Sequence, residues 1–127
     1  MRYLSAAQIL LIHSILIDEY GGSHGVRDMH ALESLERLPA QTAFGKQLYK
    51  TIFLKAALYA RNVITGHPFI DGNKRAGITA ALVFLENNGY RITSREGEVG
   101  RYAIRIARTE PSLGKIAAWL KKHSRKV

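Results

Sequence analysis

The sequence predicts an all-α protein, a compact bundle of about six helices with minimal β-structure. Apolar residues recur at steps of three and four, the spacing of a helical face, rather than at the step of two typical of strands. Helix-capping residues and glycines separate these periodic segments, and the connections between them are short. No repeat, low-complexity tract or linker-like segment interrupts the 127 residues, so we expect a single domain over residues 1–127.

Two helices are expected in the N-terminal part. Ser5 can cap a first helix that runs to about Tyr20, and the segment GGSHG at 21–25 then breaks the helical pattern. Asp28 can cap a short second helix that ends at Pro39. The residues expected to face the core are Ile9, Ile12 and Leu16 in the first helix and Leu32, Leu35 and Leu38 in the second.

Two longer helices are expected next, over about 45–65 and about 73–88, with Gly66 and Gly89 as their stop signals. Their buried stripes are expected to comprise Leu48, Ile52, Ala56, Tyr59 and Val63 in the third helix and Ile78, Ala81, Leu82 and Leu85 in the fourth.

The C-terminal part is expected to hold a short extended segment at 90–94 and two helices, at about 96–108 and about 112–123. Ser112, which follows Pro111, is the expected N-cap of the last helix. We expect the basic tail KKHSRK at 121–126 to be solvated and frayed.

Composition narrows the classes of function. No stretch approaches the roughly 20 apolar residues of a membrane-spanning helix, and the apolar run at 9–17 lacks a following signal-peptide cleavage pattern, so we expect a cytoplasmic protein without membrane association. The absence of cysteine excludes disulfides and thiolate metal sites. A net charge of +9, from 19 Lys and Arg against 10 Asp and Glu, implies an acidic partner such as nucleic acid, nucleotide or an acidic protein surface.

The segment HPFIDGNKRAG at 67–77 concentrates polar chemistry at the junction of the third and fourth helices. The first backbone N–H groups of a helix have no intrahelical partner and favour anions. Gly72 permits close backbone approach to a ligand, and Asn73, Lys74 and Arg75 add a side-chain amide and two cations beside those N–H groups. These residues favour a phosphate-binding site.

Two further residues of this segment suggest catalysis. Asp71 would repel a phosphate unless a cation lay between them, so it is a candidate Mg²⁺ ligand, with helix capping as the alternative. His67 can accept a proton from an incoming hydroxyl. Phe69 is expected to point the other way and to anchor the loop in the core, and His13 is expected to be a core residue.

The segment HPFIDGNKRAG resembles the signature loop of the Fic/Doc proteins, H-x-F-x-D/E-G-N-x-R. Upstream, EYGGSHGVRD at 19–28 and LESLERLPAQ at 32–41 resemble the N-terminal half of the Doc (death on curing) branch. The resemblance covers nearly the whole chain and implies the all-α Fic/Doc fold and transfer of part of a nucleotide to a protein hydroxyl. It also implies a loop-stabilising salt bridge for Arg27 and Asp28.

The resemblance implies one of two reactions. Fic enzymes generally transfer AMP, and their motif continues G-N-G-R-x-x-R; here Lys74 replaces the glycine and Ile78 the second arginine. Doc shares both departures and transfers the γ-phosphate of ATP to a threonine of translation elongation factor Tu, which arrests protein synthesis. We therefore expect a kinase-type toxin. AMP transfer is the alternative, because Gly72 is the more Fic-like residue.

Carried over from the family, His67 is the general base, Asp71 supports Mg²⁺, and Gly72, Asn73, Lys74 and Arg75 form the anion hole for the phosphate of the substrate ATP. Lys74 counts as catalytic too, because its cation favours a terminal phosphate in the hole.

No inhibitory S/T-x-x-x-E-G/N motif is present, so we expect inhibition by a separate antitoxin whose acidic segment folds on binding. A third hypothesis is a basic helical nucleic-acid-binding module. The dispersed cations and the lack of a recognition-helix pattern argue against direct nucleic-acid binding.

Overall fold

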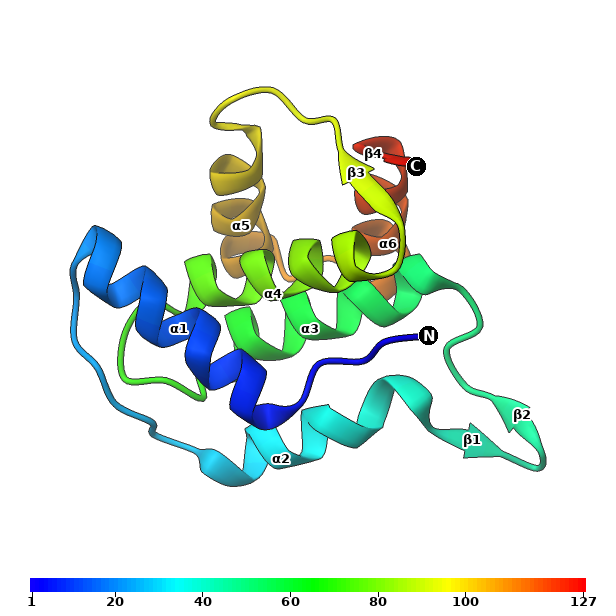
Figure 1. The fold of residues 1–127 in the computed structure, drawn as a ribbon, viewed down its shortest axis with the longest axis horizontal. Coiled ribbons are helices and arrows are strands. Elements are labelled where there is room, and N and C mark those ends of the chain that lie inside the picture. The colour runs from blue at the N-terminus through cyan, green and yellow to red at the C-terminus, as the bar shows by residue number, and fades with distance from the viewer.

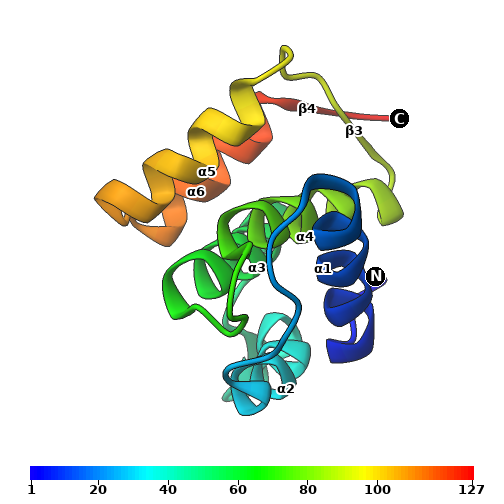
Figure 2. The same cartoon turned by 90° about the vertical axis from the view of Figure 1, so that its left-hand side faces the viewer.

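The computed structural model describes residues 1–127, and its centre is an antiparallel pair of helices, α3 (Ile52–Gly66) and α4 (Asn73–Asn87). Helices α5 (Glu98–Thr109) and α6 (Leu113–Lys122) lie side by side across one face of this pair, while α1 (Ala6–Tyr20) and α2 (Met29–Arg37) lie on the other side (Figures 1 and 2). The all-α prediction is confirmed: six helices carry the fold, and its four strands have two or three residues each.

Small side chains let α3 and α4 approach each other closely. A Cβ atom built on Gly77 would lie 2.7 Å from Cγ1 of Ile64 and 3.0 Å from the carbonyl oxygen of Ala60, so no larger residue fits there without movement. The other small residues buried in the two helices are Ala56, Ala57, Ala60, Ala76, Ala80 and Ala81. This seam fixes the position of the loop that joins the two helices.

Helices α1 and α2 begin as predicted. Ser5 forms a capping box with Gln8, and the Asp28 carboxylate accepts a hydrogen bond from the backbone N–H of Ala31. In α1, Ile9 and His13 are buried as predicted, but Ile17 is buried as well, while Ile12 and Leu16, which were predicted to face the core, are half-buried. In α2, Leu32 and Leu35 are buried as predicted, but Leu38 begins a 3₁₀ turn (Leu38–Ala40) and is half-buried.

The predicted start of the third helix at about residue 45 is wrong. Residues 42–47 form a hairpin of β1 (Thr42–Ala43) and β2 (Lys46–Gln47), and Thr51 caps α3 six residues later than predicted. Phe44 and Gly45 both have positive φ, 52° and 77°, as a two-residue hairpin turn requires, and a helix cannot pass through them. Leu48, predicted to be buried, consequently lies outside the helix and is exposed.

The C-terminal tail is also ordered, contrary to the prediction. Strand β4 (Ser124–Lys126) pairs antiparallel with β3 (Tyr90–Ile92), which lies in the predicted extended segment. Helices α5 and α6 are found within two residues of their predicted bounds, and Ser112 caps α6 by accepting from the N–H of Lys115. The frayed-tail prediction considered charge alone and omitted the unpaired edge that residues 90–92 offer.

Both ends of the chain are fastened at the end of α4. The N–H of Arg2 donates to the side-chain oxygen of Asn88, and the N–H of Val127 donates to the carbonyl of Gly89. In addition, the N–H of Leu4 donates to the buried hydroxyl of Tyr59. None of the helices combines the length and the hydropathy needed to cross a bilayer.

Candidate functional site

The loop between α3 and α4 is held from beneath by two buried side chains. Phe69 is buried and stacks on the ring of His13, with 3.8 Å between ring centroids and 2° between planes. Asn73 accepts a hydrogen bond from the N–H of Phe69 and donates one to its carbonyl, both 3.0 Å long. Phe69 therefore anchors the loop, as predicted, and Asn73 fixes the loop's conformation with its side-chain amide.

The N-terminus of α4 presents unpaired backbone donors. Its N-cap is Gly72, at φ 76°, which makes no side-chain capping bond. The first bond of the helix runs from the N–H of Ala76 to the carbonyl of Gly72, so the N–H groups of Asn73, Lys74 and Arg75 have no acceptor in the molecule. Three adjacent free donors at a positive helix end form an anion-binding site.

Gly72 is required here for two reasons. Its φ lies in the left-handed region, which favours glycine. A Cβ atom at this position would also lie 3.0 Å from Cδ1 of Ile17 and 3.6 Å from Nε2 of His13. The turn therefore seats the start of α4 tightly against α1.

Asp71 is attached to the loop at 21–25. Its Oδ2 accepts from the N–H of Ser23 at 3.1 Å, and its Oδ1 accepts from the N–H of Gly72 at 2.9 Å. The close approach to this loop depends on Gly22, where a Cβ atom would lie 2.7 Å from Oδ2. The alternative role of Asp71 as the cap of α4 is wrong, since none of the first-turn N–H groups of the helix donates to it.

A cavity of about 500 Å³ opens directly in front of the anion-binding helix end. Asp71, Gly72, Asn73, Lys74 and Arg75 line one side. The opposite walls are mostly apolar and come from the end of α1 and the start of α5; they include Leu16, Ile17, Tyr20, Val99, Ala103 and Ile104. The cavity thus combines a cationic, donor-rich end with apolar walls, the usual character of a small-molecule site.

The two cations of the anion-binding end have no acidic partner. Lys74 and Arg75 are exposed, and neither lies within ion-pair distance of a carboxylate. The Arg75 guanidinium lies 4.1 Å from the ring centroid of Tyr20, which places it over the aromatic face. Arg75 is thereby held at the rim of the cavity with its hydrogen-bond donors free.

His67 lies at the C-terminal end of α3, outside the lining of the cavity, and its side chain is exposed. Its residue adopts the left-handed conformation, φ 51°, and caps the helix. The Nδ1 atom lies 3.1 Å from the carbonyl of Thr65; because a carbonyl only accepts, Nδ1 carries the hydrogen of the neutral ring and Nε2 keeps a free lone pair. A neutral imidazole held in this way presents Nε2 as a hydrogen-bond acceptor.

Arg27 supports this arrangement from the neighbouring loop. Its Nε and Nη2 donate to the carbonyls of His67 and Gly66, at 2.8 and 2.9 Å. The salt bridge expected between Arg27 and Asp28 is absent, because Asp28 caps α2 while Arg27 binds carbonyl oxygens. A short antiparallel contact between Val26 and Phe69 joins the same two loops.

Comparison with known proteins identifies this arrangement. A model of the Fic/DOC family matches residues 3–85, which include α1 to α3, all but the last two residues of α4 and the whole loop at 67–77. The chain belongs to the Fic/Doc family. It is 29% identical over 123 residues to the Protein kinase doc of Escherichia phage P1, a match that covers 96% of this chain and 95% of that protein. It is 33% identical over 93 residues to the Toxin Doc of Mycolicibacterium smegmatis, which covers 73% of this chain and 69% of that protein.

Within this Fic/Doc fold, the structure brings five of the six predicted site residues to the cavity, whereas His67 is not among its lining residues. One residue differs in detail from its prediction: the side-chain amide of Asn73 binds the loop, so Asn73 offers a ligand its backbone N–H alone. His13 is the core residue that was predicted, but sequence reasoning missed its contact with the loop, in which Nε2–H donates to the carbonyl of Asp71 at 2.7 Å, and it missed Tyr20. It also missed the wall from α5, which the periodicity of residues 99–104 alone does not assign to a site.

Proposed function

We propose that this protein is a toxin that transfers the γ-phosphate of ATP to a hydroxyl group of a target protein. The observation that carries the proposal is the set of three free N–H groups at the start of α4, flanked by Lys74 and Arg75 and facing a cavity of about 500 Å³. The Doc relatives, one named a protein kinase and the other a toxin, support it.

The terminal phosphate of ATP would bind at the helix end. Its oxygens would accept from the N–H groups of Asn73, Lys74 and Arg75 and from the side chains of Lys74 and Arg75. The apolar walls contributed by α1 and α5 suit the uncharged part of the nucleotide. Lys74 would favour a terminal phosphate over an internal one, because its cation would occupy the space into which a further phosphate extends.

His67 would act as the general base. Its Nε2 takes the proton of the target hydroxyl while the hydroxyl oxygen forms a bond to the γ-phosphorus. The bond between that phosphorus and the bridging oxygen breaks, and ADP leaves with the electron pair. The exposure of His67 suits a protein target, which arrives from solvent. The fixed donors of α4 neutralise charge throughout, the main requirement of phosphoryl transfer.

Asp71 is the residue that would hold Mg²⁺. Its carboxylate is exposed, and each oxygen accepts one backbone hydrogen bond, which leaves a lone pair on each for a cation. One carboxylate together with phosphate oxygens and water matches the coordination that Mg²⁺ prefers, and the ion would neutralise phosphate charge when bound.

The Doc resemblance extends the proposal to the partners. The target would be translation elongation factor Tu, so that the transfer arrests translation in the cytoplasm. A cognate antitoxin with an acidic segment that folds on binding would restrain the activity, and the charge of +9 suits such a partner.

AMP transfer is the alternative reaction, because Gly72, the N-cap of α4, is the residue of the loop that is more typical of Fic enzymes. Incubation of the protein with purified elongation factor Tu and ATP labelled at the γ or at the α position distinguishes the two. We expect the γ label on the target, its loss in His67→Ala, and its retention in the control His30→Ala, which changes an exposed histidine outside the cavity. Transfer of the α label instead would establish AMP transfer, and transfer of neither label to any protein in a bacterial lysate would refute both reactions.

A further inference from the structure

A second cavity, of about 310 Å³, lies between α5 and α6 and shares no residue with the first. Tyr102 and Trp119 form its apolar floor, and Arg105, Lys115 and Lys122 stand around it. We call these five residues the α5–α6 groove. It lies on the two helices that cover one face of the central pair (Figure 2), outside the segment that the family model matches.

The cations of the α5–α6 groove are not neutralised within the molecule. Arg105, Lys115 and Lys122 are exposed, and the only ion pairs of the structure join histidines to Asp18 and Glu98. The surrounding segment is strongly basic: ten of the 19 Lys and Arg but only three of the ten Asp and Glu lie in residues 89–127, a net charge of +7 out of +9. Such a surface attracts an acidic partner.

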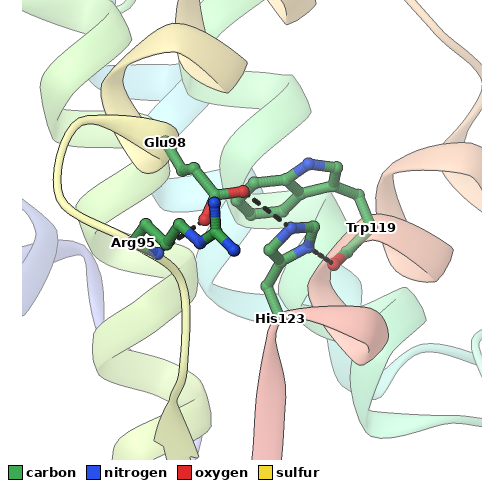
Figure 3. Close-up of polar contacts among 4 residues, drawn as sticks. All are labelled: Arg95, Glu98, Trp119 and His123. Carbon is green, nitrogen blue, oxygen red and sulfur yellow. Dashed lines mark hydrogen bonds and ion pairs between the residues drawn. The ribbon is translucent and has the colours of Figure 1, made fainter.

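The aromatic floor is rigid because its rings are stacked. The ring of Trp119 lies between Tyr102, at 4.1 Å and 2°, and His123, at 3.9 Å and 19°. Figure 3 shows His123 held in place by hydrogen bonds to the carbonyl of Trp119, at 2.8 Å, and to the carboxylate of Glu98, at 3.1 Å.

This stacking bears on the class of ligand. Single-stranded nucleic acid gains affinity when its bases stack on exposed aromatic faces. Both faces of the Trp119 indole are already covered, so the ring offers only its edge to a ligand. An apolar edge surrounded by cations suits an apolar side chain flanked by carboxylates better than it suits a base.

We propose that the α5–α6 groove docks an acidic, amphipathic segment of a partner protein. Carboxylates of the segment pair with Arg105, Lys115 and Lys122, and an apolar side chain covers the edges of Tyr102 and Trp119. The inference gives the acidic partner proposed above a docking surface and in that respect rests on the proposed function, but it does not depend on the transfer reaction, which uses the other cavity.

Trp119 provides a direct assay, because it is the only tryptophan of the chain. The probe is a synthetic amphipathic helical peptide of Glu, Ala and Leu, compared with the same peptide carrying Gln in place of Glu. We expect the Glu peptide to change Trp119 emission saturably and the Gln peptide to bind at least about tenfold more weakly. The double variant Arg105→Glu, Lys115→Glu should lose binding to a similar extent.

Lys50→Glu is the matched control, since Lys50 is exposed and lies outside both cavities. It should leave the affinity for the peptide within about twofold of the wild type. Circular dichroism checks that the groove variant is folded. An equal loss of peptide affinity in Lys50→Glu would show that the peptide responds to the net charge of the protein and not to the groove. Tighter binding of an oligouridine RNA than of the peptide would show that the groove binds nucleic acid. Either result, or no saturable change with the Glu peptide, overturns the proposal.

Discussion

Replacement of Asn73 by alanine tests whether this residue stabilises the loop or contacts a ligand. Its amide satisfies the N–H and the carbonyl of Phe69, a buried residue whose backbone has no other hydrogen-bond partner. An unpaired buried polar group costs about 1–3 kcal/mol, so loss of both bonds should lower the free energy of unfolding by about 2–6 kcal/mol. That is a large share of the stability of a typical domain, about 5–15 kcal/mol.

Urea unfolding monitored by circular dichroism measures this loss. Asn87→Ala is the matched control, because Asn87 is exposed at the other end of the same helix and makes no side-chain hydrogen bond; it should change the free energy by less than about 0.5 kcal/mol. If Asn73→Ala were as stable as this control and yet failed to bind ATP, the amide would be a ligand contact and the role in loop structure would be refuted.

Three other changes test separate contacts. Arg27→Ala should lower kcat of the proposed transfer about 10- to 100-fold with KM for ATP unchanged, because His67 loses its position. Arg27→Lys should not restore kcat, since an ammonium group cannot make both hydrogen bonds of the guanidinium. An unchanged kcat in Arg27→Ala would contradict the role of Arg27 in positioning His67. The hydrogen bond from the backbone N–H of Arg95 is the main cause that lowers the pKa of Glu98 below 4.5, and His123 adds to it. The ionised carboxylate of Glu98 therefore stabilises the fold above pH 4.5, and this contribution is lost as the pH falls below that value. Unfolding between pH 3 and 7 should therefore be less pH-dependent in Glu98→Gln than in the wild type. Burial raises the pKa of Tyr59 from 10.0 to about 12, so its contribution, up to about 3 kcal/mol, is present below pH 10 and lost as the pH rises toward 12. Tyr59→Phe should flatten this alkaline loss of stability, and an unchanged slope would contradict the assignment.

The helices could be predicted where capping and periodicity agreed. Ser5, Asp28 and Ser112 mark helix starts within the local sequence, and all three act as N-caps. The start of α3 was missed because the apolar spacing of 48 and 52 extended the helical pattern backward to the hairpin at 42–47. The evidence against a helix there was the backbone geometry of Phe44 and Gly45, and propensity does not assign a positive φ to phenylalanine.

The candidate site was predictable only where it is continuous in sequence. The loop from His67 to Arg75 carries its own signal, because glycine, amide and cations occur together before a helix. The contacts that orient the loop come from residues 40 to 58 positions away, such as Arg27 to His67 and His13 to Asp71. These pairs depend on how α1 packs against α4, and tertiary packing of this kind leaves no local pattern in a single sequence.

Because both chain ends are attached to neighbouring residues, Asn88 and Gly89, the order of the helices and strands along the chain could be changed by circular permutation. Since Arg2 and Val127 bind neighbouring residues after α4, and Figure 1 shows both chain ends on the same side of the molecule, a glycine-rich linker could close the backbone into a ring. Such a ring could be reopened at the Phe44–Gly45 turn, far along the chain from either cavity's lining residues. The circularly permuted protein would begin with β2 and then the central helix pair, and of the strand pairings only the two-residue β1–β2 pair would lose its connecting turn.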